Sequence, residues 1–128
     1  MGLEQVREVT GEHPCDKRRP MREVRQDFPN VDFSSVSSEE DDMYLEDRRE
    51  TDEEASVRCE AFLTWLGGRE EVEVVVVTHS AFLRVLLQKT TLCVPSARAL
   101  WYKNCEMRTF SLEAPHNEDE GKEEENKN

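Results

Sequence analysis

The sequence predicts an α/β fold, and three local patterns support that class. A run of valines within residues 72–78 is typical of a buried strand. A polar turn and an apolar helical segment at residues 81–87 follow it directly. A further helical pattern, at residues 51–66, carries one apolar stripe that must face a core. A strand, a turn and a buried helix in succession form half of a βαβ unit, from which parallel sheets are built.

The N-terminal part predicts little regular structure. Residues 1–12 are compatible with a short helical piece that ends at Gly11, because glycine is common just after helices. Residues 13–38 combine Pro, Ser and Arg with scattered apolar side chains, which indicates an ordered but irregular segment. His13 begins a stretch that lacks further ligands at zinc-finger spacing, so no metal site is expected. The cations at residues 17–19 form either a phosphate-binding patch or a turn with solvated side chains.

Residues 39–54 are strongly acidic and predict a solvated loop that leads into a helix; a docking site for basic partners is the alternative. Thr51 and Glu54 have the spacing of a capping box, in which each side chain satisfies a free backbone N–H group. The apolar stripe of the following helix consists of Ala55, Cys59, Phe62 and Leu66. Two glycines, at residues 67 and 68, end the helix.

The valine run does not alternate between polar and apolar residues, so both faces of the strand should be covered, as in a parallel sheet. Ser80 is the expected N-cap of the helix that follows. Residues 107–112 alternate and predict a further strand near an edge of the sheet. Residues 113–128 are acidic, lack apolar periodicity and are expected to be disordered. The predicted organisation is therefore one domain at residues 1–112 and an acidic tail.

Composition limits the partners of this 128-residue chain, whose length suits one domain or less. Charged residues make up 36%, and 17 basic against 29 acidic residues give a net charge of −12. This balance argues against nucleic acid and anionic membrane surfaces as partners, because both require basic patches. The sequence has no apolar run long enough to span a bilayer. Its four cysteines include no Cys-x-x-Cys pair, so we expect reduced thiols and a cytoplasmic location.

His79 is the first candidate site residue, because it lies between the valine strand and the helix after it. Ligands of open α/β sheets bind at this position, where helix N-termini present free N–H groups. An anion such as phosphate would meet those groups and the imidazole together, and the histidine would stabilise charge on a transferring phosphoryl group. Packing at a strand end is the alternative role. Arg7 and Glu8 would supply an anion clamp and an acid, although alone they are ordinary surface charges.

Six segments in matching order carry a specific resemblance over residues 3–110. They are residues 8–19 (Glu-Val-Thr-Gly-Glu-His-Pro-Cys-Asp-Lys-Arg-Arg), 28–34, 49–51, 62–66, 77–80 (Val-Thr-His-Ser) and 104–108 (Asn-Cys-Glu-Met-Arg). Together they resemble the plant- and protist-type phosphoglycerate mutase-like proteins of the histidine phosphatase superfamily. The resemblance implies a three-layer α/β/α sandwich of the phosphoglycerate mutase-like type, with its N-terminal part missing from this chain.

The resemblance also implies a phosphohistidine mechanism without metal or cofactor. In this family a histidine of an Arg-His-Gly motif attacks the phosphoryl group, and a second histidine, matching His79, stabilises the transition state. Glu8 matches the general acid that protonates the leaving alkoxide. Arg7 and Ser80 match positions that bind substrate. In the phosphatases of this family water then hydrolyses the phosphoenzyme, so the resemblance implies that the parent protein is a phosphomonoesterase for a phosphorylated small molecule; mutase chemistry is the alternative.

The sequence departs from the family pattern because it contains no Arg-His-Gly. We therefore expect the chain to be an inactive fragment of the enzyme domain; a non-catalytic phosphate- or partner-binding protein is the alternative. Without the family's first strand, the valine strand would also offer an open edge to another chain. The resemblance does not select a substrate, and the oligomeric state stays open.

Overall fold

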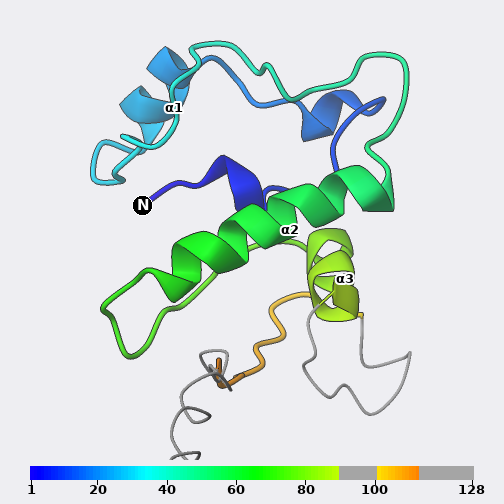
Figure 1. The fold of residues 1–128 in the computed structure, drawn as a ribbon. Helices are drawn as coiled ribbons and strands as arrows, with labels where there is room; N and C mark the ends of the chain where they lie inside the picture. The colour runs from blue at the N-terminus through cyan, green and yellow to red at the C-terminus, as the bar shows by residue number, and fades with distance from the viewer. Residues whose placement is uncertain (90–100, 113–128) are drawn as a thin grey trace, which may run out of the picture.

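Helices make up the regular structure of the residues that the computed structural model describes, 1–89 and 101–112 (Figure 1). Two single-turn 3₁₀ helices lie near the N-terminus, η1 (Glu4–Val6) and η2 (Pro14–Asp16). They are followed by the α-helices α1 (Met21–Asp27), α2 (Asp52–Gly67) and α3 (Ser80–Lys89). The long helix α2 crosses the molecule, with α3 packed against its N-terminal half and η1 alongside it.

The predicted capping box begins α2. The Thr51 hydroxyl accepts from the Glu54 N–H at 3.2 Å, and the Glu54 carboxylate accepts from the Thr51 N–H at 2.9 Å. The helix ends at Gly67, and Gly68 is its C-cap, as the two glycines predict. Local sequence alone therefore determines both ends of this helix.

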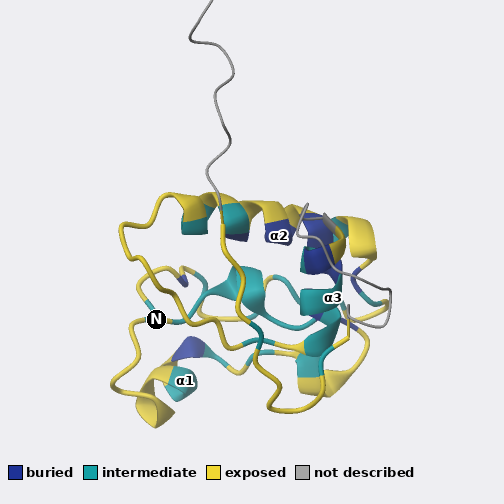
Figure 2. Ribbon diagram, turned by 90° about the horizontal axis from the view of Figure 1, so that it is seen from below, coloured by how far each residue is buried: buried dark blue, intermediate teal, exposed yellow. Residues whose placement is uncertain are grey.

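The apolar stripe of α2 faces the core, as predicted. Ala55 and Cys59 lie in one buried cluster with Val9 from the N-terminal segment and Phe82 and Val85 from α3. Figure 2 shows these buried positions where α2 meets α3. Further along α2, Phe62 is buried and Leu66 is partly exposed. Burial raises the pKa of the Cys59 thiol to about 11, so this cysteine serves packing rather than thiolate chemistry.

The strand predicted at residues 72–78 is not formed in this structure. The segment runs back from the end of α2 to α3 without pairing to any described residue as a strand (Figure 1). Its valines are exposed, with Val75 82% and Val77 88% accessible. The physical reason is that a strand is stable only beside hydrogen-bonded neighbours. No segment among residues 1–89 and 101–112 supplies one.

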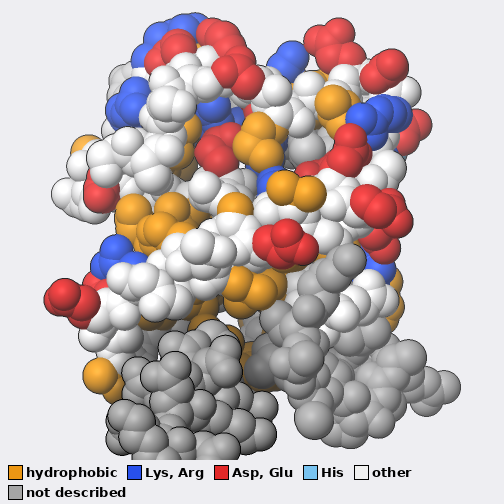
Figure 3. All heavy atoms as spheres, viewed as in Figure 1, with side chains coloured by type: hydrophobic (Ala, Val, Ile, Leu, Met, Phe, Trp, Pro, Cys, Tyr) orange, Lys and Arg blue, Asp and Glu red, His pale blue; other side chains and the backbone are white. Residues whose placement is uncertain are grey.

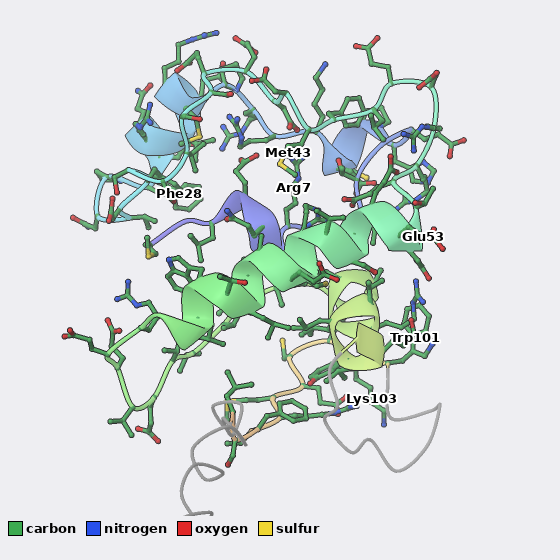
Figure 4. The ribbon with its side chains drawn as sticks, in the orientation of Figure 1. Arg7, Phe28, Met43, Glu53, Trp101 and Lys103 are labelled. Atoms are coloured by element: carbon green, nitrogen blue, oxygen red, sulfur yellow. The ribbon has the colours of Figure 1, made fainter. Side chains whose placement is uncertain are left out.

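The edge strand predicted at residues 107–112 is also not formed. Met107 and Leu112 are exposed. The preceding stretch contacts α3 through Trp101, whose ring lies under the Arg84 guanidinium at 5.4 Å (Figure 4). The Arg108 guanidinium lies 4.0 Å from the Tyr102 ring. Side-chain contacts of this kind, rather than a β-ladder, position the segment.

Gly11 does not end a helix, because the short helical piece η1 already ends at Val6. Gly11 instead forms an isolated antiparallel bridge with Arg49 and has a φ of 102°. A Cβ atom at this position would lie 2.2 Å from the Arg48 carbonyl oxygen. Glycine is therefore required here by a close backbone approach and a left-handed conformation.

The segment at residues 13–38 is more regular than predicted, since it contains η2 and α1. Pro20 stands at the N-cap of α1, and Met21 is its one buried residue. A helix of seven residues with a single buried side chain has too little apolar periodicity to stand out in the sequence.

The acidic stretch at residues 39–54 is only partly a solvated loop. The Asp41 side chain is fully inaccessible and pairs with Arg7, and Glu50 is buried against Arg58. Glu39 pairs with Arg22 at the surface. Figure 3 shows both acidic and basic side chains on this face of the molecule. Internal pairing leaves fewer carboxylates for a basic partner than the sequence suggests.

Three further expectations concern cysteines, the tail and membranes. Cys15, Cys59 and Cys105 are free thiols, whereas Cys93 and the predicted tail at residues 113–128 lie outside the described residues. Within the described part of the chain, no helix has the length and apolar character needed to cross a membrane.

Candidate functional site

A cleft of about 320 Å³ brings together three of the predicted site residues, Arg7, Glu8 and His79. They come from the segment after η1 and from the residue directly before α3. The rest of the wall consists of Leu3, Glu4, Cys15, Asp16, Lys17 and Arg18. The cleft therefore joins segments that lie more than half the chain apart, and most of its lining is charged.

Glu8 caps the start of α3. Its carboxylate accepts from the Phe82 N–H at 3.0 Å and from the Ala81 N–H at 3.5 Å. It also accepts from the Val9 N–H at 2.8 Å. Helix N-termini favour negative charge, because their N–H groups are free and the helix dipole is positive there. The anion-binding position that the sequence predicts beside His79 is thus held by an internal carboxylate.

Ser80 is not the N-cap of α3, contrary to the prediction. It is the first residue of the helix, and the carbonyl of His79 accepts the first helical bond, from Leu83 at 3.0 Å. The acceptor for the free N–H groups comes from Glu8, which lies far away in sequence and is invisible to a local capping rule.

His79 is exposed and is held at the cleft by its neighbours. The Thr78 hydroxyl donates to the Val6 carbonyl, which ties the approach to α3 to η1. Together with the Leu83 bond, this contact fixes the backbone on both sides of the imidazole. The side chain is free to meet a solute that enters the cleft.

Arg7 is committed to an internal ion pair. Its Nη1 and Nη2 atoms each donate to an Asp41 carboxylate oxygen at 2.6 Å, and Nη2 also donates to the Asp16 carbonyl at 2.7 Å. Figure 4 shows Arg7 beside Met43, whose N–H group also bonds to Asp41. Burial alone would raise the pKa of Asp41. The bonds from Arg7, Arg18 and Met43 outweigh it and hold that pKa below its ordinary range.

Lys17, Arg18 and Arg19 differ in how strongly they are held by other groups of the protein. These contacts bear on whether the three cations form a phosphate-binding patch or a turn with solvated side chains. Arg18 donates to Glu4 at 2.7 Å and to four backbone carbonyls, so it is a structural clamp. Arg19 pairs with Asp27 at 2.7 Å. Lys17 is half-exposed and lies 3.6 Å from an exposed Glu46 carboxylate. Lys17 is therefore the cation of the cleft that is freest to meet an anion.

Arg58 and Glu50 form a buried ion pair behind the cleft that sequence reasoning missed. The Arg58 Nε and Nη2 atoms each donate to Glu50 at 2.6 Å. Arg58 also donates to the carbonyls of Gln5 at 2.7 Å and Arg7 at 3.1 Å, which holds the segment that carries Glu8. One signal could have found it: Arg58 lies four residues before Phe62, so it shares the buried face of α2.

Metal binding finds no support in the described part of the chain. No group of three His, Cys, Asp or Glu side chains among those residues could hold a metal ion. The side chains that line the cleft supply an imidazole, carboxylates, a thiol and cations.

Acid should destabilise the fold through two carboxyls. Asp41 and Glu54 both have folded pKa values below their ordinary ones; bonds from Arg48 and Thr51 bring that of Glu54 to about 2. A lowered folded pKa contributes stability above the ordinary pKa, and this contribution is lost as pH falls through the folded value. We expect the urea midpoint to fall between about pH 4.5 and pH 2. Because the pair of Glu54 with Arg48 is exposed, Asp41 should account for most of the fall, and Glu54→Gln should reduce it only slightly. A midpoint that stays constant over this interval would contradict the prediction.

The family model of the histidine phosphatase superfamily, branch 1, matches residues 13–119, which include His79. The chain belongs to this superfamily. The matched residues begin after Arg7 and Glu8, so the family match itself does not cover these two. The fold of the superfamily is α/β, which agrees with the class that the sequence predicts.

Three relatives come from Arabidopsis thaliana, and they confirm the resemblance to plant phosphoglycerate mutase-like proteins. The chain is 43% identical over 113 residues to phosphoglycerate mutase-like protein 1, which covers 85% of the chain and 40% of that protein. It is 40% identical over 108 residues to phosphoglycerate mutase-like protein 2, covering 81% of the chain and 32% of the relative. A third phosphoglycerate mutase-like protein is 34% identical over 116 residues, covering 88% of the chain and 43% of the relative. The chain thus spans less than half the length of these relatives, and no solved structure matches it.

Proposed function

We propose that this chain contributes the phosphate-binding half of the active site of a histidine phosphatase that hydrolyses phosphomonoesters. The observation that carries the proposal is the cleft in which His79, Glu8 and the first N–H groups of α3 meet. An imidazole, a cation at Lys17 and a helix N-terminus together suit a phosphoryl group, once the Glu8 carboxylate turns away from the Ala81 and Phe82 N–H groups. The internal carboxylate at this position marks it as a site that accepts negative charge.

Each residue has a distinct part in the proposed reaction. His79 donates to the phosphoryl oxygens and stabilises the charge that develops on them. Glu8 protonates the leaving alkoxide, for which its carboxyl must turn from the α3 N–H groups toward the substrate oxygen. In the complete enzyme the Ser80 hydroxyl binds the substrate phosphate, and Arg7 binds it only when its guanidinium is released from Asp41. The phosphoryl group passes to a histidine nucleophile and then to water, and no metal takes part.

The proposed architecture is the three-layer α/β/α sandwich of phosphoglycerate mutase-like proteins. The exposed valines at residues 72–77 support it, because β-branched side chains in a run are typical of a central strand. In the proposed sandwich, segments corresponding to the unmatched length of the relatives pair with this run. The same proposal makes the 128-residue chain inactive alone, since its sequence has no Arg-His-Gly to supply the nucleophile.

A non-catalytic phosphate-binding protein is the second candidate, and one observation favours it. Among the described residues, the lining of the cleft contains His79, Glu8 and Lys17 but no second histidine that could act as the nucleophile. Such a protein would bind phosphate in the same cleft and would never form a phosphoenzyme. The two candidates therefore share the binding step and differ in turnover.

Substituting His79 tests the proposed function. We expect His79→Gln to weaken the binding of inorganic phosphate by roughly tenfold or more, because a charge-assisted hydrogen bond is lost. Isothermal titration of the purified chain measures the effect. His13→Gln is the matched control, since His13 does not line the cleft, and it should bind as the unaltered chain does. Equal affinities for both variants would contradict the proposal.

An aryl phosphate assay on the same preparations separates the two candidates further. The unaltered chain should show no turnover above that of His79→Gln. Turnover that depends on His79 would mean that a group of this chain, either His79 itself or a residue that acts with it, accepts the phosphoryl group, and the proposed inactivity would be wrong.

A further inference from the structure

We propose that Asp41 sets the phosphate affinity of the cleft by withholding the Arg7 guanidinium from the incoming anion. The inference rests on the proposed function, because it concerns the same cleft. It adds an affinity-determining residue that lies outside the cleft lining and has no part in the chemistry.

The geometry of the ion pair carries the proposal. Both terminal nitrogens of Arg7 donate to Asp41, at 2.6 Å each, in the fork geometry that a guanidinium would also offer to a phosphate. The Asp41 side chain is inaccessible to solvent, so water screens its charge less than that of an exposed carboxylate. A phosphate in the cleft therefore competes with a buried carboxylate for the same donors.

The remaining contacts of Asp41 show why it stays in place. Its carboxylate also accepts from the Arg18 N–H at 2.7 Å and from the Met43 N–H at 3.2 Å. These backbone donors fix the carboxylate independently of Arg7. Arg7 in turn keeps its bond to the Asp16 carbonyl at 2.7 Å, which holds the guanidinium at the cleft wall when Asp41 is neutral.

Replacing Asp41 with asparagine tests the competition directly. The amide keeps the size of the side chain but removes its charge, so the Arg7 charge becomes available to the cleft. We expect Asp41→Asn to bind inorganic phosphate about tenfold more tightly than the unaltered chain in isothermal titration. A gain of affinity cannot come from loss of structure, which distinguishes this role from a purely structural one.

The matched control is Glu46→Gln, which removes the same charge near another cation of the cleft. Lys17 lies 3.6 Å from Glu46, and both side chains are substantially exposed, so the affinity should change less than about threefold. An equal gain in both variants would overturn the proposal, because net charge would then explain it. Unchanged affinity in Asp41→Asn would also overturn it, while the proposed function would stand if His79→Gln still binds weakly. If no variant binds phosphate, both proposals fail.

A second measurement keeps the proposal testable if Asp41→Asn does not fold. The side-chain ¹⁵N signals of Arg7 in the unaltered chain can be followed by NMR during a titration with inorganic phosphate. They should stay unchanged while the backbone signals of Ala81 and Phe82 move to saturation. Arg7 signals that move together with those of α3 would show that Asp41 does not withhold the guanidinium.

Discussion

Replacing Arg58 with methionine should lower the free energy of unfolding by about 3–5 kcal/mol, the usual cost of leaving one charge of a buried ion pair without its partner. The Glu50 carboxylate would lose two bonds of 2.6 Å in a buried position. The carbonyls of Gln5 and Arg7 would also lose a donor. Urea unfolding followed by circular dichroism measures the loss, and the segment that carries Glu8 should become the first to open.

Two further variants show whether the unpaired carboxylate is the cause. Adding Glu50→Leu to Arg58→Met should recover most of the loss, because an apolar pair tolerates burial. Arg48→Met is the matched surface control: it breaks an exposed pair with Glu54 and should change the midpoint little. A loss as large in Arg48→Met as in Arg58→Met would mean that burial of the pair is not what matters.

Truncating Phe82 to alanine should cost about 3–5 kcal/mol, because it empties a well-packed site in the core. Phe82 is 0% exposed and lies in the cluster that joins α2, α3 and the N-terminal segment. The Arg58 guanidinium also lies over its ring at 5.1 Å. Thermal unfolding of the variant should therefore show a large drop in midpoint.

Val75→Ala is the informative comparison for Phe82→Ala. The sequence places Val75 in a buried strand, where truncation would cost roughly 1–3 kcal/mol. In the structure Val75 is 82% exposed, so its truncation should leave the stability of this chain nearly unchanged. A clear loss in Val75→Ala would support the buried strand and contradict the exposed segment described above.

The contrast between α2 and the valine run shows which features the sequence could predict. The capping box of Thr51 and Glu54 and the stripe of Ala55 and Cys59 act within a few residues of each other, and the structure confirms them. A strand depends on partners that are distant in sequence, and periodicity cannot say whether they are present. The valine run therefore shows that residues 72–78 favour a strand, whereas the structure shows that no described segment pairs with them.

The same distinction applies to the site. The resemblance selected Arg7, Glu8 and His79, and the structure places them in one cleft. The pairing of Arg7 with Asp41 and the capping of α3 by Glu8 link residues 34 and 74 positions apart. No local rule predicts such contacts, because they depend on which segments the fold brings together. Asp41 and Glu50 in the acidic stretch consequently looked solvated in the sequence, whereas in the structure both are buried in ion pairs.

A phosphate titration of the 128-residue chain, followed by backbone amide NMR, tests the central claim most directly. A second cleft, of about 250 Å³ and lined by Arg25, Phe28 and Val31 among others, serves as an internal control. If the cleft at His79 is the phosphate site, the amide signals of Ala81 and Phe82 should shift and saturate while those of Phe28 and Val31 stay constant. Shifts confined to the second cleft, or no saturable shift at the start of α3, would contradict the claim.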